Sequence, residues 1–164
     1  SPPLSVQQAL TINTVAAAGR NDSIATATPL SNGTYSASLS PGDNGAGGYS
    51  PDRDYYVVTA KAGVTVTVDI RAQRLAPPSL MDSVVQILDA NGNEFTTCRM
   101  TSQGAFDNFC TNDDLASGGS TDSYLEFQVP GVPGTPVTFY IRVLEWRGMA
   151  RPDFVYTITI AGAN

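Results

Sequence analysis

The sequence predicts an all-β protein, a single-domain β-sandwich of jelly-roll type with about eight antiparallel strands. Three observations favour this fold class. Short apolar runs alternate with polar residues at period two, turn residues separate nearly all of these runs, and no segment shows a convincing period of 3.6. Repeated short strands of this kind are typical of sandwiches and jelly rolls. A chain of 164 residues also has the size of one domain.

The chain begins with a segment that does not resemble the rest. Residues 1–20, which start Ser-Pro-Pro, are interpreted as a leader or linker, and residues 21–164 as the sandwich domain. A single helical turn is expected over residues 24–27, after the cap-like cluster Asn21-Asp22-Ser23 and before Pro29.

The expected strands share short apolar runs with polar neighbours: residues 34–39, 55–59, 64–70, 84–88, 124–129, 137–143 and 156–160. Residues 64–70 carry the clearest alternation, with valine or isoleucine at every even position. Residues 84–88 lead through the turn signal Asn91-Gly92 into a second, polar strand, so a hairpin is expected there. Residues 100–122 are interpreted as a loop.

Composition excludes several function classes. The net charge is −6 and the nine basic residues are scattered, which argues against nucleic acid and anionic membranes as partners. There is no histidine, so Ser-His-Asp and Cys-His machinery and His-ligated zinc are excluded within this chain. No apolar run is long enough to span a membrane.

The two cysteines, Cys98 and Cys110, flank a polar, glycine-containing segment. We expect them to form a disulfide, which would place the protein in an oxidising compartment: secreted, periplasmic or at the cell surface. The alternative is two reduced thiols in a cytosolic protein.

Two further features are candidate sites. Asp113, Asp114 and Asp122 form an acidic cluster, and paired carboxylates can act as acid and base in glycoside hydrolysis. Turn chemistry is the favoured interpretation of this cluster, and a weak ion site is the third alternative. Trp146 ends a strong strand and is the best single candidate for an exposed ligand-binding residue, although the favoured interpretation is that it caps the end of the core. The strand tyrosines are either a stacking platform or cross-strand shields of a sheet face: Tyr55, Tyr56, Tyr124, Tyr140 and Tyr156.

Four stretches follow one another in a recognisable order: residues 21–27, 52–58, 82–92, and 112–114 with 122–125. Their order and spacing resemble the bacterial pre-peptidase C-terminal (PPC) domain, from about residue 21 to the end. The family comprises small β-sandwiches appended to secreted peptidases and other exported proteins, and is related to the collagen-binding domains of clostridial collagenases.

The resemblance implies a non-catalytic accessory domain of an exported protein, not an enzyme. Such a domain assists secretion, stability or attachment to an extracellular protein or polysaccharide surface, while catalysis belongs to a parent domain. Competing interpretations are a carbohydrate-binding module, a structural envelope or adhesive protein, and a small hydrolase that uses acidic residues.

The resemblance also implies a structural calcium ion, held by Asn21, Asp22, Asp52 and Asp54. Calcium takes six to eight oxygen ligands. The calcium-binding members carry acidic residues where this chain has Ala17 and Gly19. The alternative is that Asn21 or Asp22 caps the helical turn, while Asp52 and Asp54 order a loop through local hydrogen bonds.

Overall fold

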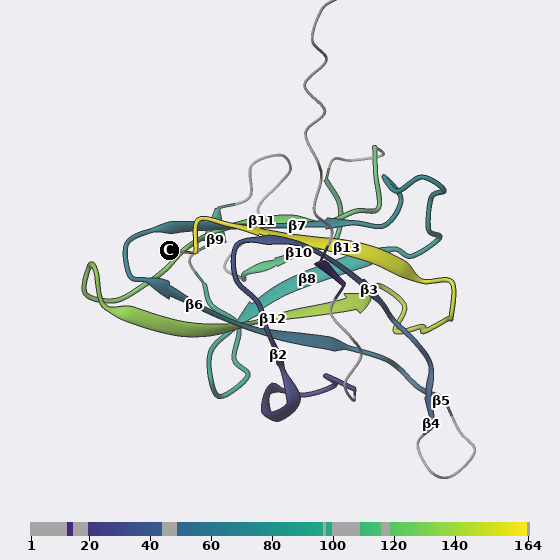
Figure 1. Cartoon of the computed structure of the whole chain (residues 1–164), viewed down its shortest axis with the longest axis horizontal. Helices are drawn as coiled ribbons and strands as arrows, with labels where there is room; N and C mark the ends of the chain where they lie inside the picture. The colour runs from purple at the N-terminus through teal and green to yellow at the C-terminus, as the bar shows by residue number, and fades with distance from the viewer. Residues whose placement is uncertain are drawn as a thin grey trace, which may run out of the picture.

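Two β-sheets face each other in the computed structural model (Figure 1), which describes residues 13–14, 20–43, 49–96, 98–99, 109–115 and 119–163. The first sheet has the spatial order β1 (Asn13–Thr14), β3 (Gly33–Ser38), β13 (Val155–Ala161), β7 (Thr65–Arg71), β11 (Tyr124–Gln128) and β9 (Cys98–Arg99). The second has the order β10 (Thr111–Asn112), β8 (Ser83–Leu88), β12 (Pro136–Glu145), β6 (Asp54–Lys61) and β2 (Thr28–Pro29). The short strands β4 (Gly42–Asp43) and β5 (Tyr49–Ser50) pair with each other.

The jelly-roll sandwich predicted from the sequence is confirmed, although one of its eight strands, β10, is not among those predicted. Its two layers are β3-β13-β7-β11 and β6-β12-β8-β10, and every pairing within them is antiparallel. Along the chain these strands pass from one layer to the other at each step except from β8 to β10, as the double-sheet arrangement requires. Two short edge strands depart from the prediction, because β1 pairs in parallel with β3 and β2 in parallel with β6.

The period-two alternation of the strands places their apolar side chains in the core, as expected. Because successive strand side chains point to opposite faces, the apolar residue at every second position enters the space between the sheets. The fully buried members include Val66, Val68, Ile70, Ile87, Leu125, Phe127, Phe139, Ile141, Val143, Tyr156 and Ile158. Phe127 packs edge-on against Phe139 across the two sheets, with ring centroids 5.0 Å apart.

The hairpin expected after residue 88 is only partly formed. The turn exists: Asp89 accepts the backbone N–H of Gly92, and Gly92 has φ +82°. Beyond it, however, the part of the chain that the structure describes has a single bridge, from Leu88 to Glu94. The chain then turns inward, because Phe95 packs on Phe127 at 4.9 Å, and β9 joins the other sheet.

Two local elements also differ from expectation. The helical turn is a single 3-10 turn, η1 (Ile24–Thr26). Within the segment interpreted as a loop, β10 adds to the edge of β8, where Ile87 donates its N–H to the carbonyl of Cys110. A strand of two residues is too short to carry a period.

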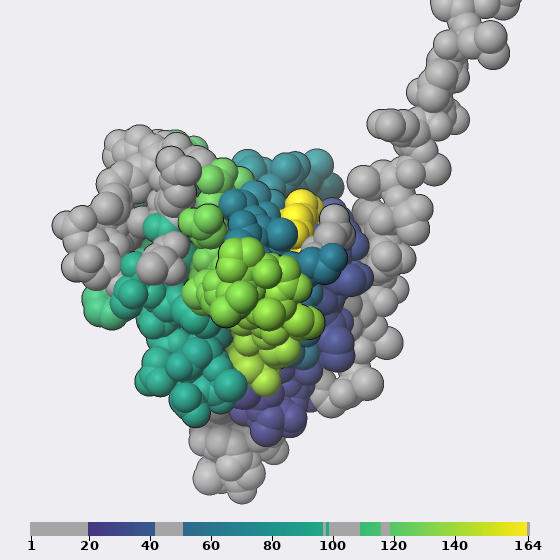
Figure 2. All heavy atoms as spheres, turned by 90° about the vertical axis from the view of Figure 1, so that its left-hand side faces the viewer, coloured from purple at the N-terminus to yellow at the C-terminus, as the bar shows by residue number. Residues whose placement is uncertain are grey.

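The topology gathers the β7–β8, β10–β11 and β12–β13 connections at one end of the sandwich, the right-hand end in Figure 1. Figure 2 looks onto the opposite end, where the connection between β11 and β12 projects at the centre of the face. Among the described residues, no helix is long and apolar enough to cross a membrane.

Candidate functional site

The four residues expected to bind calcium lie near the start of the domain, and Arg20 lies among them. Its Nε donates to Asp22 Oδ2 at 2.5 Å, its Nη2 to Asp52 Oδ1 at 3.1 Å, and its Nη1 to the carbonyl of Ser40 at 3.4 Å. Asp52 is buried, whereas Asp22 is exposed. A guanidinium therefore bridges two of the expected ligands.

Two further side-chain atoms of this group, Asp52 Oδ2 and Asn21 Nδ2, also have hydrogen-bond partners. Asp52 Oδ2 accepts the backbone N–H of Ser40 at 2.6 Å, so the alternative of a loop ordered by this aspartate describes the observed contacts. Asn21 donates its side-chain amide to the carbonyl of Tyr55 at 3.0 Å. It does not cap η1; Ser23 occupies that position, donating its N–H to Thr26 Oγ1 at 3.2 Å.

Asp54 lies deeper and ties the two sheets together. Its Oδ2 accepts a hydrogen bond from the Tyr156 hydroxyl on β13, and the Tyr156 and Tyr56 hydroxyls are 2.6 Å apart. Burial raises the pKa of Asp54 to about 7, against the opposing effect of the Tyr156 hydroxyl. Burial likewise raises the pKa of Asp52 to about 6, with the neighbouring Asp22 carboxyl as the next cause.

These residues do not fit a calcium ion. Calcium requires six to eight oxygens turned toward one point. Here the carboxylate oxygens that converge accept hydrogen bonds from Arg20, Ser40 and two tyrosines. Within the described ranges, no three acidic, histidine or cysteine side chains are arranged to hold a metal ion.

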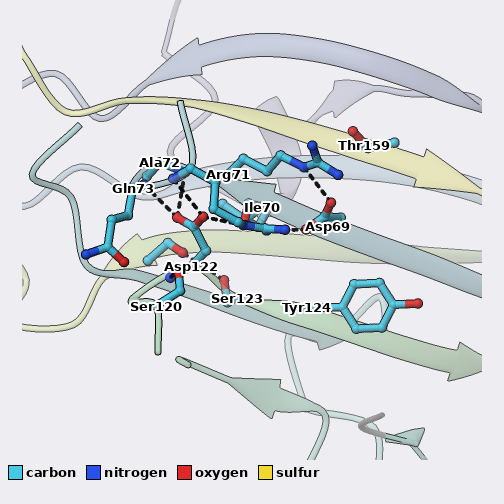
Figure 3. A network of polar contacts seen from close by, with 12 residues as sticks. Asp69, Ile70, Arg71, Ala72, Gln73, Ser120, Asp122, Ser123, Tyr124 and Thr159 are labelled. Carbon is cyan, nitrogen blue, oxygen red and sulfur yellow. Dashed lines mark hydrogen bonds and ion pairs between the residues drawn. The ribbon is translucent and has the colours of Figure 1, made fainter. Parts of the chain in front are cut away.

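Asp122 is the centre of a second polar network, shown in Figure 3. It is fully buried, and its Oδ1 accepts the backbone N–H groups of Ala72 and Gln73, both at 2.7 Å. Its Oδ2 accepts from Arg74, through the backbone N–H at 3.1 Å and through Nε at 2.6 Å. Arg74 Nη2 also binds Asp69 Oδ1 at 2.5 Å. This one carboxylate therefore shapes the start of the β7–β8 connection.

The electrostatics of Asp122 oppose a role as catalytic acid. Burial alone would raise its pKa, but the N–H donors of residues 72–74 and the Arg74 side chain outweigh burial and lower the pKa. Asp113 and Asp114 act elsewhere: after burial, which is the larger cause, they contribute to the raised pKa of Asp82. Turn and loop chemistry therefore describes Asp122, as the favoured interpretation expects.

Trp146 begins the turn between β12 and β13 and is 58% exposed. Its N–H donates to the carbonyl of Asp82 at 2.9 Å. The preceding residue, Glu145, is buried, and its Oε2 accepts the N–H groups of Arg147 at 2.8 Å and Met149 at 2.9 Å. The turn that presents the indole is thus fixed from inside by a carboxylate, and Trp146 does not cap the core.

The other aromatic candidates do not form an outward row. Tyr55, Tyr56 and Tyr156 are buried, while Tyr124 and Tyr140 are half-buried. The expected disulfide is present between Cys98 and Cys110, with the Cα atoms 5.0 Å apart. It joins the edge strand β9 of one sheet to the residue that precedes β10 of the other.

Sequence reasoning missed Arg20 and the partnership of Asp54 with Tyr156. Arg20 falls in the segment interpreted as a leader, although it directly precedes the Asn21-Asp22 pair, and that adjacency was the available signal. Asp54 and Tyr156 are separated by 102 residues, so no local pattern could have joined them.

Comparison with known proteins finds a match among solved structures but none among family models or curated proteins. Among solved structures, the chain is similar to the pre-peptidase C-terminal domain of collagenase from Bacillus anthracis, with 12% identity and a TM-score of 0.45. The match covers 94% of this chain and 99% of that domain. That domain is of the same family that the four sequence stretches resemble.

Proposed function

We propose that this chain is a non-catalytic accessory domain of an exported protein, and that it attaches to an extracellular protein or polysaccharide surface through Trp146. The observation that carries the proposal is an exposed tryptophan on a turn that buried groups hold in place. Tryptophan is among the residues that most often dominate the energy of binding interfaces.

The fixed turn supports attachment because it lowers the entropic cost of binding. The turn is held at three points: Glu145 Oε2 accepts two backbone N–H groups, the Glu145 carbonyl accepts the N–H of Gly148 at 2.8 Å, and the Asp82 carbonyl accepts that of Trp146. A side chain on a pre-organised backbone loses less freedom when it binds. Met149, in the same turn, is 42% exposed and extends the apolar surface.

The disulfide supports export. Disulfides persist in oxidising compartments and are rare in the cytosol. Cys110 is fully buried against the core, so the bond belongs to the packed structure. A secreted, periplasmic or surface location follows as part of the proposal.

The half-buried sheet-face tyrosines do not favour a carbohydrate-binding module that stacks sugars on a row of exposed aromatic rings across one sheet. An attachment domain with one anchoring indole needs no such row. Polysaccharide and fibrous protein are therefore both retained as possible surfaces, and binding measurements separate them.

The test is retention of the purified chain on insoluble polysaccharide and on a fibrillar protein, measured by depletion from solution. We expect retention on one of them, and a loss of about tenfold in affinity for Trp146→Ala, corresponding to about 1.4 kcal/mol. Val132→Ala is the matched control, because Val132 is 71% exposed and lies in the β11–β12 connection at the opposite end (Figure 2). Equal retention of Trp146→Ala and wild type would refute the proposal, as would no retention on either surface.

A further inference from the structure

We infer that the Arg20 side chain supplies the positive charge that neutralises Asp22 and Asp52, so that the N-terminal part of this domain is stabilised without calcium. The inference is independent of the proposed attachment function. It concerns what replaces the ion that the sequence resemblance implies.

The guanidinium lies between the two carboxylates. Nε and Nη2 of Arg20 each donate to a different aspartate, at 2.5 Å to Asp22 and 3.1 Å to Asp52. Its third contact, from Nη1, is to the carbonyl of Ser40 at 3.4 Å. Two acidic side chains and one carbonyl are the kind of oxygen set that surrounds a bound cation, and here an arginine side chain binds them.

Burial makes this cation matter more for Asp52 than for Asp22. The side chain of Asp52 is 7% exposed, whereas that of Asp22 is 41% exposed. A buried carboxylate needs a compensating charge or hydrogen bonds. Asp52 has both, from Arg20 on Oδ1 and from the backbone N–H of Ser40 on Oδ2.

The same contacts tie three parts of the chain together. Arg20 precedes η1, Ser40 follows β3, and Asp52 precedes β6. Arg20 and Asp52 together therefore fasten the beginning of the domain to the connection between its first two long strands. Asn21 continues this attachment, since its carbonyl accepts the N–H of Tyr55 at 2.8 Å.

Thermal unfolding of the full chain tests the inference in two ways. First, the wild-type melting temperature should be the same in EDTA and in millimolar calcium chloride. A ligand that binds only the folded state must raise the melting temperature, so a clear increase with calcium would overturn the inference.

Second, Arg20→Gln should lower the melting temperature by about 2–4 °C, the response of a domain of this size to losing a partly buried ion pair. Arg53→Gln is the matched control, because Arg53 is exposed and lies between Asp52 and Asp54 in the sequence. It removes the same charge from the same neighbourhood without touching the bridge. Equal effects of the two substitutions would show that general charge balance, and not the Arg20 bridge, stabilises this region, and would overturn the inference.

Discussion

Replacing Asp122 by asparagine should be among the most damaging single-atom changes in this domain. The aspartate is fully buried and accepts four hydrogen bonds, two on each oxygen. Asparagine keeps one acceptor oxygen, which can still serve the N–H groups of Ala72 and Gln73. Its amide nitrogen, however, would face the two donors of Arg74 that Oδ2 now receives.

The magnitude follows from the donors left without an acceptor. A buried donor that loses its partner costs about 1–3 kcal/mol, and more where a charge is involved. Arg74 itself is exposed and water can reach its donors, so the cost lies at the lower end of this range: about 2 kcal/mol for Asp122→Asn, or a fall of roughly 4–8 °C in melting temperature at this chain length.

Urea unfolding followed by far-ultraviolet circular dichroism measures the change in the free energy of unfolding. Asp153→Asn is the matched control, since Asp153 is paired with Arg151 but both side chains are at least half exposed. Exposed pairs contribute at most about 1 kcal/mol. If Asp122→Asn lost no more stability than Asp153→Asn, Asp122 would not stabilise the β7–β8 connection as described.

The pH dependence gives a second check on Asp122. Its pKa is lowered in the folded chain, so the folded state binds fewer protons than the unfolded state near the ordinary value of 3.8. The stabilisation is therefore complete above that value and is lost as pH falls through the folded-state pKa. The difference between wild type and Asp122→Asn should stay constant from neutral pH to about pH 5 and shrink in stronger acid.

Three other changes have defined outcomes. Compared with wild type, Asp54→Asn should have nearly the same melting temperature near pH 4 and a higher one above pH 7. The pKa of Asp54 is about 7 in the folded chain against the ordinary 3.8, so wild-type stability falls as pH rises between these values. A difference in melting temperature that does not depend on pH would contradict burial as the cause. Reducing the Cys98–Cys110 disulfide should cost about 3 kcal/mol, visible as a lower melting temperature once thiol titration shows both cysteines free, and an unchanged temperature would count against it. Gly162→Ala should destabilise the chain more than Gly134→Ala, by about 1–3 kcal/mol in chemical denaturation. Both glycines have positive φ, but only at Gly162 would the new Cβ clash with a backbone carbonyl oxygen, that of Thr65 in β7. Equal losses of stability would exclude that clash.

The long strands could be predicted because their sequence carries its own period. The runs that became β7, β12 and β13 each place several apolar side chains on one face, and this pattern survives whatever they pair with. The turn at Gly92 was likewise local, since it needs only a residue that tolerates positive φ. The two-residue strand β10 carried no such signal, because its place depends on hydrogen bonds to β8.

The sequence brings three acidic residues of the candidate site together but does not identify the groups they contact. Residues Asp22, Asp52 and Asp54 do lie in one neighbourhood, as the resemblance implies. What they bind depends on distant partners: Arg20 lies 32 positions before Asp52, and Tyr156 lies beyond β12. An aspartate looks the same in sequence whether its partner is an arginine, a tyrosine or an ion.

The place of β13 in the first sheet constrains when this chain can fold. β13 is the last strand of the eight, yet it lies between β3 and β7 and pairs with both. A ribosome makes β3 and β7 first, and neither can meet its central partner until residues 155–161 have been synthesised. Pairing between such distant segments slows folding. The early strands β3 and β7 therefore stay without their shared partner until β13 has been made, and the first sheet can close only after that step.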